Sequence, residues 1–533
     1  MGESNPSFHS PERIVKPVRG TEGHLPMRAT SRGQFKVSTM AASRLRRIAR
    51  NAASMLASDV VNRVTTFVLY ALVARHLGAV EFGQMSLALS MFFTFGVFAG
   101  AGLKTLITRE VAKDSGQTDR YLVNGSAVSF VSSLLSLGFL LLLVRLMRYS
   151  TDTAAIVVLL GLGLLPRSLS TVCEGVFQAR EQMHFIAYAN GLVSLAKVGL
   201  AFLILSRGHG LGGLVMLLVV SQLATLGVEW WLMLKHITRP RFQIDPRFSL
   251  RMIRSTSTFL GIDGGIAIWA GLNILILSTL ATETEVGYYS AVSQVMVPVM
   301  LVLESIALSV FPAMCRRFQV SLQDSKAIAQ GLIEIMLTIA LPVVVGLFFL
   351  ADGILLLMYG RDDFLLASGA LRILVWSLIP LGLGHVLGKV LVATLREKVT
   401  LRIVTIDLVV ALALGLVLVR WLGVTGAAIA ALITRIVDLI QHYVLVSRLL
   451  PKMSVTLRRA AWKPIVATAF MALCLAVVRD RGLILTVASG GAAYAAILLA
   501  LTVWSMGGFG RFKAVCLRLL GRPAPRACGE EAG

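Results

Sequence analysis

The sequence predicts an all-α polytopic membrane protein with about 14 transmembrane helices, arranged as two six-helix bundles with pseudo-two-fold symmetry plus two C-terminal helices. Three observations support this prediction. The 533 residues are 56% hydrophobic and 15% charged, with a mean hydropathy of +0.78, well above the apolar share of a soluble domain. Long apolar runs recur from residue 51 to about residue 505. Motifs of the first half also reappear, in the same order, in the second.

Each predicted span is an apolar run separated from the next by a short polar break. A spanning helix needs about 20 mostly apolar residues. The runs that we take as spans cover residues 52–76, 83–104, 122–146, 154–177, 185–206, 211–235, 256–281, 287–312, 328–350, 367–394, 402–420, 424–447, 462–478 and 482–505. The first, fourth and tenth carry Ser, Thr, Asn and charged residues, which predicts that they face a bundle interior or a water-filled cavity. This pattern is typical of a transporter.

The predicted topology accounts for the net charge of +23. With the N-terminus inside, about 37 of the 51 Lys and Arg residues lie on one side of the membrane and about 8 on the other. Both termini are therefore predicted to be cytoplasmic. Positive-inside bias and anionic headgroups account for the basic tails, so we expect no nucleic-acid partner. The five cysteines show no spacing typical of a metal site or a disulfide framework, and we expect no cofactor.

The predicted domain order follows from these spans. Residues 1–50 form a basic, disordered cytoplasmic tail, and residues 51–240 form the N-terminal six-helix bundle. A cytoplasmic linker (241–255) leads to the C-terminal six-helix bundle (256–450). Two additional transmembrane helices (451–508) and a cytoplasmic tail (509–533) complete the chain.

Three short motifs form the internal repeat. EFGQMS (81–86) resembles EVGYYS (285–290), Arg-Glu at 180–181 matches Arg-Glu at 396–397, and GLGGL (210–214) resembles GVTGA (423–427). The offsets of 204, 216 and 213 residues differ by no more than a short loop. Six helices per copy keep both copies in one orientation, so the symmetry axis should run along the membrane normal. We expect Gly83 and Gly287 to lie at tight connections.

The ordered set of motifs resembles the polysaccharide biosynthesis family, which includes O-antigen and exopolysaccharide repeat-unit flippases. The stretches that carry the resemblance are ARHLGAVEFGQMSLALS (74–90), LITREVAKD (106–114), EGVFQAREQMHFIAYAN (174–190), LNILILSTLATETEVGYYSA (272–291) and GVTGAAIAALITRIVD (423–438). The resemblance implies the fold of the multidrug, oligosaccharidyl-lipid and polysaccharide exporter superfamily. Where many relatives carry an acid in the seventh span, this chain has Asn273.

The activity that the resemblance implies is flipping of polyprenyl diphosphate-linked oligosaccharide repeat units across the inner membrane of a bacterium, by alternating access of the two bundles. Such a protein is a transporter and not an enzyme. Its implied partners are the lipid-linked oligosaccharide, membrane lipids, and a polysaccharide polymerase with its export machinery.

Charged residues inside the spans are the candidate site residues. A cation at mid-bilayer costs about 2.5–3.5 kcal/mol on insertion scales, so each should be paired or functional. A diphosphate would need such cations to cross hydrocarbon. The candidate substrate-binding cations are Arg63, Arg167, Lys197 and Lys389, and the candidate coupling or pairing acids are Asp59, Glu174, Asp263, Glu304 and Asp407. Coupling to a proton or sodium gradient through these acids is a further hypothesis.

Two of these residues can share one helix face. Arg167 and Glu174 are seven residues apart, which places both on one lining of the fourth span. Arg167 is therefore either a diphosphate contact or a permanent partner of Glu174.

Three rival functions remain open on the sequence alone. A drug exporter of the same superfold would favour acids in the cavity, whereas the unpaired charges here are cations. A peptidoglycan-precursor flippase would share nearly every physical feature. A membrane polymerase or ligase would need catalytic groups outside the membrane, where the predicted loops are short.

Overall fold

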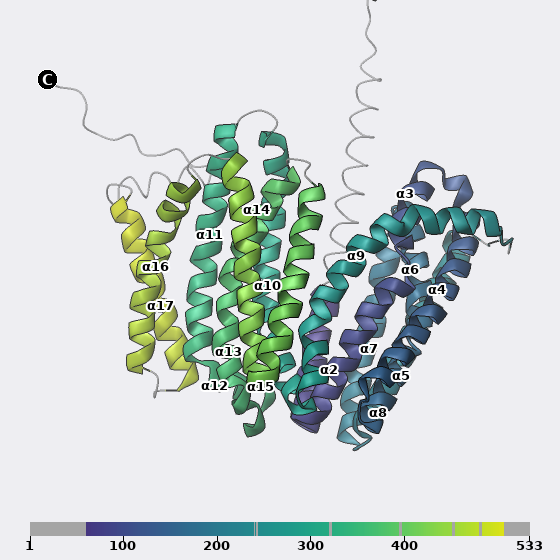
Figure 1. Cartoon of the computed structure of the whole chain (residues 1–533), viewed down its shortest axis with the longest axis horizontal. Coiled ribbons are helices and arrows are strands. Elements are labelled where there is room, and N and C mark those ends of the chain that lie inside the picture. The colour runs from purple at the N-terminus through teal and green to yellow at the C-terminus, as the bar shows by residue number, and fades with distance from the viewer. Residues whose placement is uncertain are drawn as a thin grey trace, which may run out of the picture. The chain divides into compact units, whose positions relative to one another are not determined.

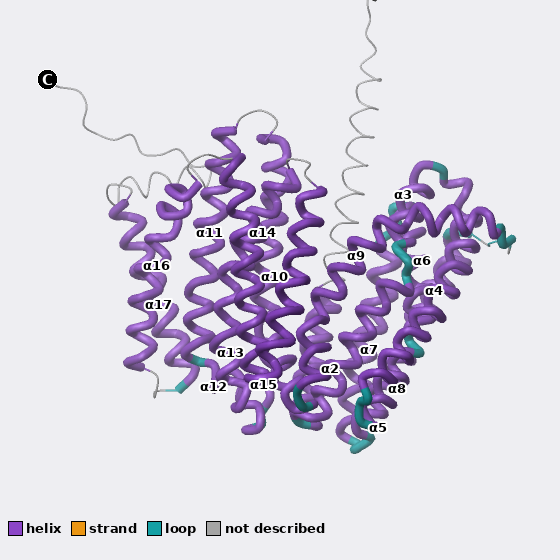
Figure 2. Tube along the Cα trace, in the orientation of Figure 1, coloured by secondary structure: helices purple, strands orange, loops and turns teal. Residues whose placement is uncertain are grey.

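The computed structural model describes residues 60–238, 240, 243–318, 322–393, 397–449, 453–478 and 482–505. The two predicted tails and Asp59 lie outside the described residues. Every regular element of the described residues is helical, as Figure 2 shows. The predicted all-α fold is confirmed.

The helices follow one another with short connections (Figure 1). A first helix covers residues 60–77. It is followed by α2 (Ala79–Ala99), α3 (Leu103–Lys113), α4 (Thr118–Met147), α5 (Thr151–Gly161), α6 (Leu164–Ala179), α7 (His184–Ser206), α8 (Gly210–His236), α9 (Pro246–Leu280), α10 (Glu283–Phe318), α11 (Leu322–Phe349), α12 (Ala351–Tyr359), α13 (Ser368–Leu374), α14 (Leu378–Ala393), α15 (Glu397–Leu449), α16 (Met453–Val478) and α17 (Leu483–Ser505).

Within the described ranges, 12 helical segments are long and apolar enough to cross a membrane. The predicted count of fourteen is not confirmed. The difference lies in two places. The first predicted span begins before the described helix 60–77. The spans predicted at 402–420 and 424–447 belong to one segment, α15, which is interrupted only at Gly423 (φ 55°, ψ −132°).

Two crossing segments of the first half, Ala79–Lys113 and Thr151–Ala179, are broken helices. Between α2 and α3, Ala101 and Gly102 take left-handed conformations (φ 49° and 66°), so the chain turns before Lys104. Between α5 and α6 the helix is interrupted at Leu162 and Gly163. Leu162 is the residue four before Pro166, whose ring has no N–H and clashes with the carbonyl at that position in a regular helix. Pro166 therefore accounts for the break between α5 and α6.

The repeated glycines lie at a helix crossing, so the expectation that they lie at connections was wrong. Gly83 lies inside α2 and Gly287 inside α10. A Cβ on Gly83 would stand 2.0 Å from the backbone oxygen of Glu283, and a Cβ on Gly287 would stand 2.0 Å from that of Ala79. Each glycine thus touches the residue four before the other, the reciprocity that a local two-fold axis requires.

α9 begins at Pro246, inside the range 241–255 that was predicted as a linker. The Asp245 side chain accepts hydrogen bonds from the backbone N–H groups of Arg247 and Phe248, and proline occupies the first helical turn. The first turns of α9 pack on the first bundle through Phe248 and Met252, which belong to the core beneath α3, α4 and α6. α16 and α17 pack together beside α11 (Figure 1).

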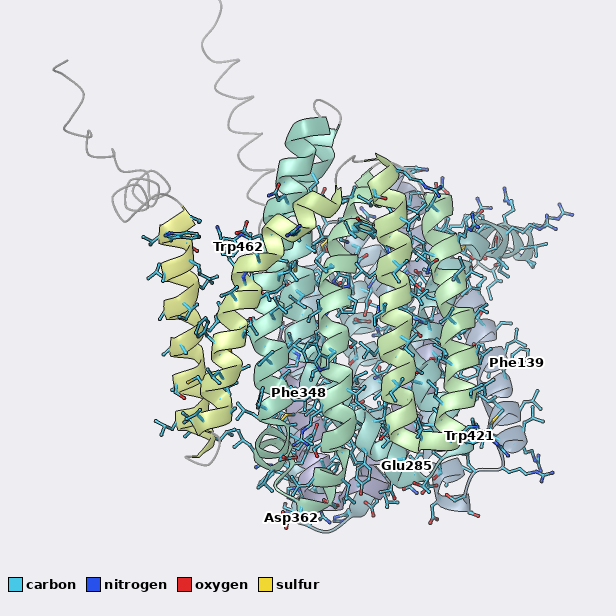
Figure 3. The ribbon with its side chains drawn as sticks, turned by 60° about the vertical axis from the view of Figure 1, so that its left-hand side comes forward. Phe139, Glu285, Phe348, Asp362, Trp421 and Trp462 are labelled. Carbon is cyan, nitrogen blue, oxygen red and sulfur yellow. The ribbon has the colours of Figure 1, made fainter. Side chains whose placement is uncertain are left out.

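The two ends of the helices differ in charge. We call the end that carries Arg109, Lys113, Arg120 and Arg247 the basic end. We call the other end, where α10 begins, the distal end. Glu285 and Asp362 lie together at the distal end, and Trp462 lies at the opposite one (Figure 3).

Candidate functional site

A cavity of about 750 Å³ lies among the first helix, α2, α3, α6, α9 and α10. This volume falls within the roughly 300–1,000 Å³ of typical small-molecule sites. Its walls come from both halves of the repeat: α2, α3 and α6 belong to the first half, and α9 and α10 to the second. The charged residues that line it are Lys104, Arg167 and Asp263.

Arg167 and Lys104 share one carboxylate. Glu174 accepts a hydrogen bond from Lys104 Nζ at 2.5 Å and a longer one from Arg167 Nη1 at 3.4 Å. The Glu174 side chain is only 4% exposed, whereas those of Lys104 and Arg167 are 35% and 40% exposed. Both cations therefore retain donors toward the cavity, since Arg167 has five N–H groups and uses one. The predicted pair of Arg167 and Glu174 is present, and Lys104 is its third member.

The start of α3 faces the same cavity. Gly102, Leu103, Lys104 and Thr105, which include its first turn, line the cavity, and no side chain caps this N-terminus. Free N–H groups and the helix dipole make such a terminus favourable for an anion. Two cations and a helix start thus converge on one region, which suits a phosphate group.

A buried acid completes this cluster. Glu229 on α8 is 0% exposed, and neither of its carboxylate oxygens has a hydrogen-bond partner among the described residues. The Ser170 hydroxyl lies beside it, and it interacts electrostatically with Glu174, Arg167 and Lys104. Sequence reasoning missed both residues: Lys104 is the last residue of the predicted span 83–104, and Glu229 lies inside the predicted span 211–235 but was not singled out among its charges. The signal for Lys104 was the glycine pair just before it.

The other predicted cations lie elsewhere. Lys197 is half-buried on α7 and interacts electrostatically with Arg167, but it does not line the cavity. Lys389 on α14 lies 5.4 Å from the ring centre of Phe311. Arg63 is exposed on the first helix, and the candidate acid Asp59 is outside the described residues. Of the four predicted cations, the structure places only Arg167 in the cavity lining.

A second polar cluster lies within the C-terminal bundle. Asp407 accepts a hydrogen bond from Gln441 at 2.8 Å. Asp438 contacts His442 at 3.0 Å. Arg435 lies over the Trp269 ring at 4.2 Å.

The remaining predicted acids and Asn273 lie in different parts of the structure. Asp263 on α9 lines the cavity. Glu304 is exposed on α10 and faces His385. Asn273, which stands where many relatives carry an acid, donates a hydrogen bond to the Tyr289 hydroxyl at 2.9 Å.

At the distal end the two halves are joined by a set of contacts that we call the distal closure. Glu283 of α10 accepts hydrogen bonds from Gln84 of α2 (2.9 Å), from Ser150 (2.7 Å) and from Thr153 of α5. The crossing of Gly83 and Gly287 lies immediately beside them. Residues from both halves thus join the two halves at the distal end.

Three further hydrogen bonds extend this closure. Arg75 at the end of the first helix donates to the carbonyls of Leu357 and Met358 on α12, at 2.6 and 2.9 Å. Tyr149 and Ser278 are 2.9 Å apart.

The sequence of this chain is similar to those of known proteins. A family model described as polysaccharide biosynthesis protein matches residues 48–318, and one described as lipid II flippase MurJ matches residues 239–489. The chain is 22% identical over 397 residues to the probable low-salt glycan biosynthesis flippase Agl15 of Haloferax volcanii, covering 74% of this chain and 82% of that one. It is 21% identical to the capsular polysaccharide biosynthesis protein CapF of Staphylococcus aureus, over 74% of this chain and 98% of that one.

Solved structures share the fold. The inward closed conformation of the lipid II flippase MurJ matches with a TM-score of 0.68 at 15% identity, over 88% of this chain and 100% of that one. An inward-facing multidrug resistance MATE transporter matches with a TM-score of 0.58 at 17% identity, over 74% and 95%. Because the first family model covers just over half of the sequence, this chain belongs to the polysaccharide biosynthesis protein family.

Proposed function

We propose that this protein flips a polyprenyl diphosphate-linked oligosaccharide from the cytoplasmic to the outer leaflet of a bacterial inner membrane, for exopolysaccharide, capsule or O-antigen synthesis. Family membership and the two curated relatives support a transporter of lipid-linked glycans. The finer statement rests on one observation, the convergence of Lys104, Arg167 and the α3 N-terminus on the cavity.

The chemistry of a diphosphate fits that region. Its charge cannot cross hydrocarbon without compensation. Guanidinium binds phosphate oxygens bidentately, and an ammonium acts as a compact point charge. Glu174 holds both cations in place when no anion is bound and would compete with the incoming phosphates, which lets the anion leave again. A broken helix whose N-terminus points at an anionic group is a recurrent solution in transporters.

The distal closure supports alternating access. If the basic end is cytoplasmic, the closure separates the cavity from the outer side, and the diphosphate would enter from the inner leaflet. Opening to the outside then requires that the contacts of Glu283 and of the two glycines break while the basic end closes. The polyprenyl tail would remain in the lipid throughout.

A peptidoglycan-precursor flippase is the second candidate. It is favoured by the match of residues 239–489 to the lipid II flippase model and by the TM-score of 0.68 to that protein's structure. Deletion of the gene separates the two functions. Lipid-linked polysaccharide repeat units should accumulate on the cytoplasmic side, whereas accumulation of lipid-linked peptidoglycan precursor would support the second candidate.

The cationic region can be tested directly. Arg167→Ala and Lys104→Ala should each reduce flipping of a fluorescent polyprenyl diphosphate-linked oligosaccharide in proteoliposomes by about 10- to 100-fold. This magnitude corresponds to the loss of one charge-assisted hydrogen bond worth about 1.5–3 kcal/mol. Arg145→Ala, at an exposed arginine on α4, is the matched control. Undiminished flipping in both cavity variants would contradict the proposal.

We further propose that a proton or sodium gradient drives the cycle through acids such as Asp59, Glu304 or Asp407. Inverted vesicles measure this step. Collapse of the relevant gradient should slow export, and export that ignores the collapse of both gradients would remove the coupling while leaving the flippase function standing.

A further inference from the structure

The distal part of the cavity has a different chemistry from the cationic part. Ser86, Ser90 and Thr94 of α2 all line it, and their spacing of four residues places three hydroxyls on one helix face. Tyr70 and Gln294 line the same part, and their side chains lie beside each other. We call these five residues the hydroxyl zone. It contains no charged side chain.

One hydroxyl of this zone lacks a partner. Serines and threonines in helices commonly donate to a backbone carbonyl three or four residues earlier, as Ser305 does to Leu301. Ser86 is only 2% exposed, yet its Oγ has no hydrogen-bond partner among the described residues. A buried hydroxyl left without a partner costs about 1–3 kcal/mol. Since Ser86 also lines the cavity, a ligand is the natural partner for it.

A glycine keeps the zone uncovered. A Cβ on Gly271 of α9 would lie 2.9 Å from Ser90 Oγ and 3.0 Å from Thr94 Oγ1. Any side chain at residue 271 would therefore press on these two hydroxyls. The aromatic rings of Phe92 and Phe93 also line the cavity, and Phe93 is 62% exposed. Hydroxyls, an amide and exposed aromatic faces thus stand together.

Charge and hydroxyls are separated along the helices. Ser86 lies roughly 20 Å of helix before Ala99, the last residue of α2, and Lys104 follows the turn beyond that end. Asp263 lies at the same level as the end of α2, because a Cβ on its neighbour Gly264 would stand 3.0 Å from the Phe98 ring. The three charged lining residues therefore gather toward the basic end, and the hydroxyl zone lies toward the distal end.

We propose that the hydroxyl zone binds sugar rings of the transported lipid and that it selects uncharged sugars; this rests on the proposed function, in which Lys104 and Arg167 hold the diphosphate. Sugar hydroxyls can both donate to and accept from Ser86, Ser90 and Gln294. The apolar faces of the rings can pack on the aromatic side chains. A uronate or a peptide carboxylate would be desolvated in this zone without a cation beside it, which is costly.

Binding of three probes to the purified full-length chain in detergent, followed by native mass spectrometry, tests the proposal. The probes are undecaprenyl diphosphate, the same lipid with a neutral trisaccharide, and the same lipid with a trisaccharide containing one glucuronate. The neutral glycolipid should bind at least about 10-fold more tightly than the bare diphosphate, as one or two good hydrogen bonds allow. The glucuronate glycolipid should bind more weakly than the neutral one.

Variants locate the effect. Ser86→Val and Gln294→Leu should bind the neutral glycolipid no more tightly than the bare diphosphate, while their affinity for the bare diphosphate stays at the wild-type value. That second value also reports that the variants are folded. Ser305→Val, at an exposed serine of α10, is the matched control and should keep the full sugar preference.

The outcomes distinguish a failure of the sugar site from a failure of the proposed flippase function. If the wild-type protein binds none of the three lipids, the proposed function fails and the sugar site fails with it. If all bind and Arg167→Ala weakens them, the function stands. The sugar site is then overturned by any of three results: no gain from the neutral sugars, equal affinity for the glucuronate lipid, or an unchanged sugar preference in both hydroxyl-zone variants.

Discussion

Replacing Gly83 by alanine should open the distal closure. The new Cβ would stand 2.0 Å from the Glu283 carbonyl oxygen, and carbon atoms in such positions stay at least about 3 Å away. Both atoms in the clash belong to helix backbones, so α2 and α10 must separate by about 1 Å. The hydrogen bond from Gln84 to Glu283 would then lengthen from 2.9 Å to about 3.9 Å, beyond hydrogen-bonding range.

The size of the effect follows from the bonds at risk. A hydrogen bond to a charged group contributes about 1.5–3 kcal/mol. Losing one such bond and straining its neighbours should destabilise the closed distal end by about 2–4 kcal/mol. Since 1.4 kcal/mol corresponds to a tenfold change in an equilibrium constant, the population of molecules open at the distal end should rise roughly 30- to 700-fold.

Labelling with a membrane-impermeant maleimide measures this population. In a chain whose native cysteines are replaced by serine, Ser90→Cys places a thiol in the cavity wall. Its labelling in spheroplasts, where the reagent reaches only the outer side, should accelerate when Gly83→Ala is added. Gly199→Ala is the matched control, because a Cβ on Gly199 of α7 meets nothing within 4 Å. Equal labelling rates with and without Gly83→Ala, at equal protein levels, would refute the reasoning.

Three other perturbations give distinct results. Glu283→Gln keeps the shape of the closure but removes the negative charge that Gln84, Ser150 and Thr153 stabilise, so the same labelling assay should show a smaller acceleration than Gly83→Ala; no acceleration would mean that the charge is unimportant. Glu174→Gln removes the competitor of the phosphates, so binding of undecaprenyl diphosphate should tighten while the thermal midpoint falls; weaker binding would show that Glu174 is needed to orient the cations. Hydrogen bonds from the Arg120 side chain and from the first backbone N–H groups of α9 hold the pKa of Asp245 below its usual range. The stabilisation of the start of α9 by the Asp245 carboxylate is therefore complete above about pH 4, and it is lost as the pH falls through the lower pKa that Asp245 has in the folded protein. Hydrogen exchange of the first turn of α9 should accelerate in that pH range in the wild type, and Asp245→Asn should remove this pH dependence. An unchanged pH profile in the variant would contradict the prediction.

The sequence by itself determined the class of the protein and most of its helices. Apolar runs long enough to span a bilayer leave few alternatives, because backbone polar groups in lipid must be satisfied within a helix. The covalent structure of proline explains the break four residues before Pro166. The interruption at Gly423 followed from the turn motif that separates two apolar runs. The resemblance carried by ordered motifs led to the correct family before any three-dimensional information was used.

Only the tertiary structure decided which charges meet and what the glycines do. Lys104 and Glu174 are 70 residues apart in sequence, and Glu229 joins them from a third helix, so no helical spacing could predict the cluster. Gly83 and Gly287 were recognisable as equivalent, but their mutual contact depends on how α2 and α10 cross. Spacing along one helix fixes which side chains share a face. It does not fix which face of another helix lies opposite, because that depends on packing between distant parts of the chain.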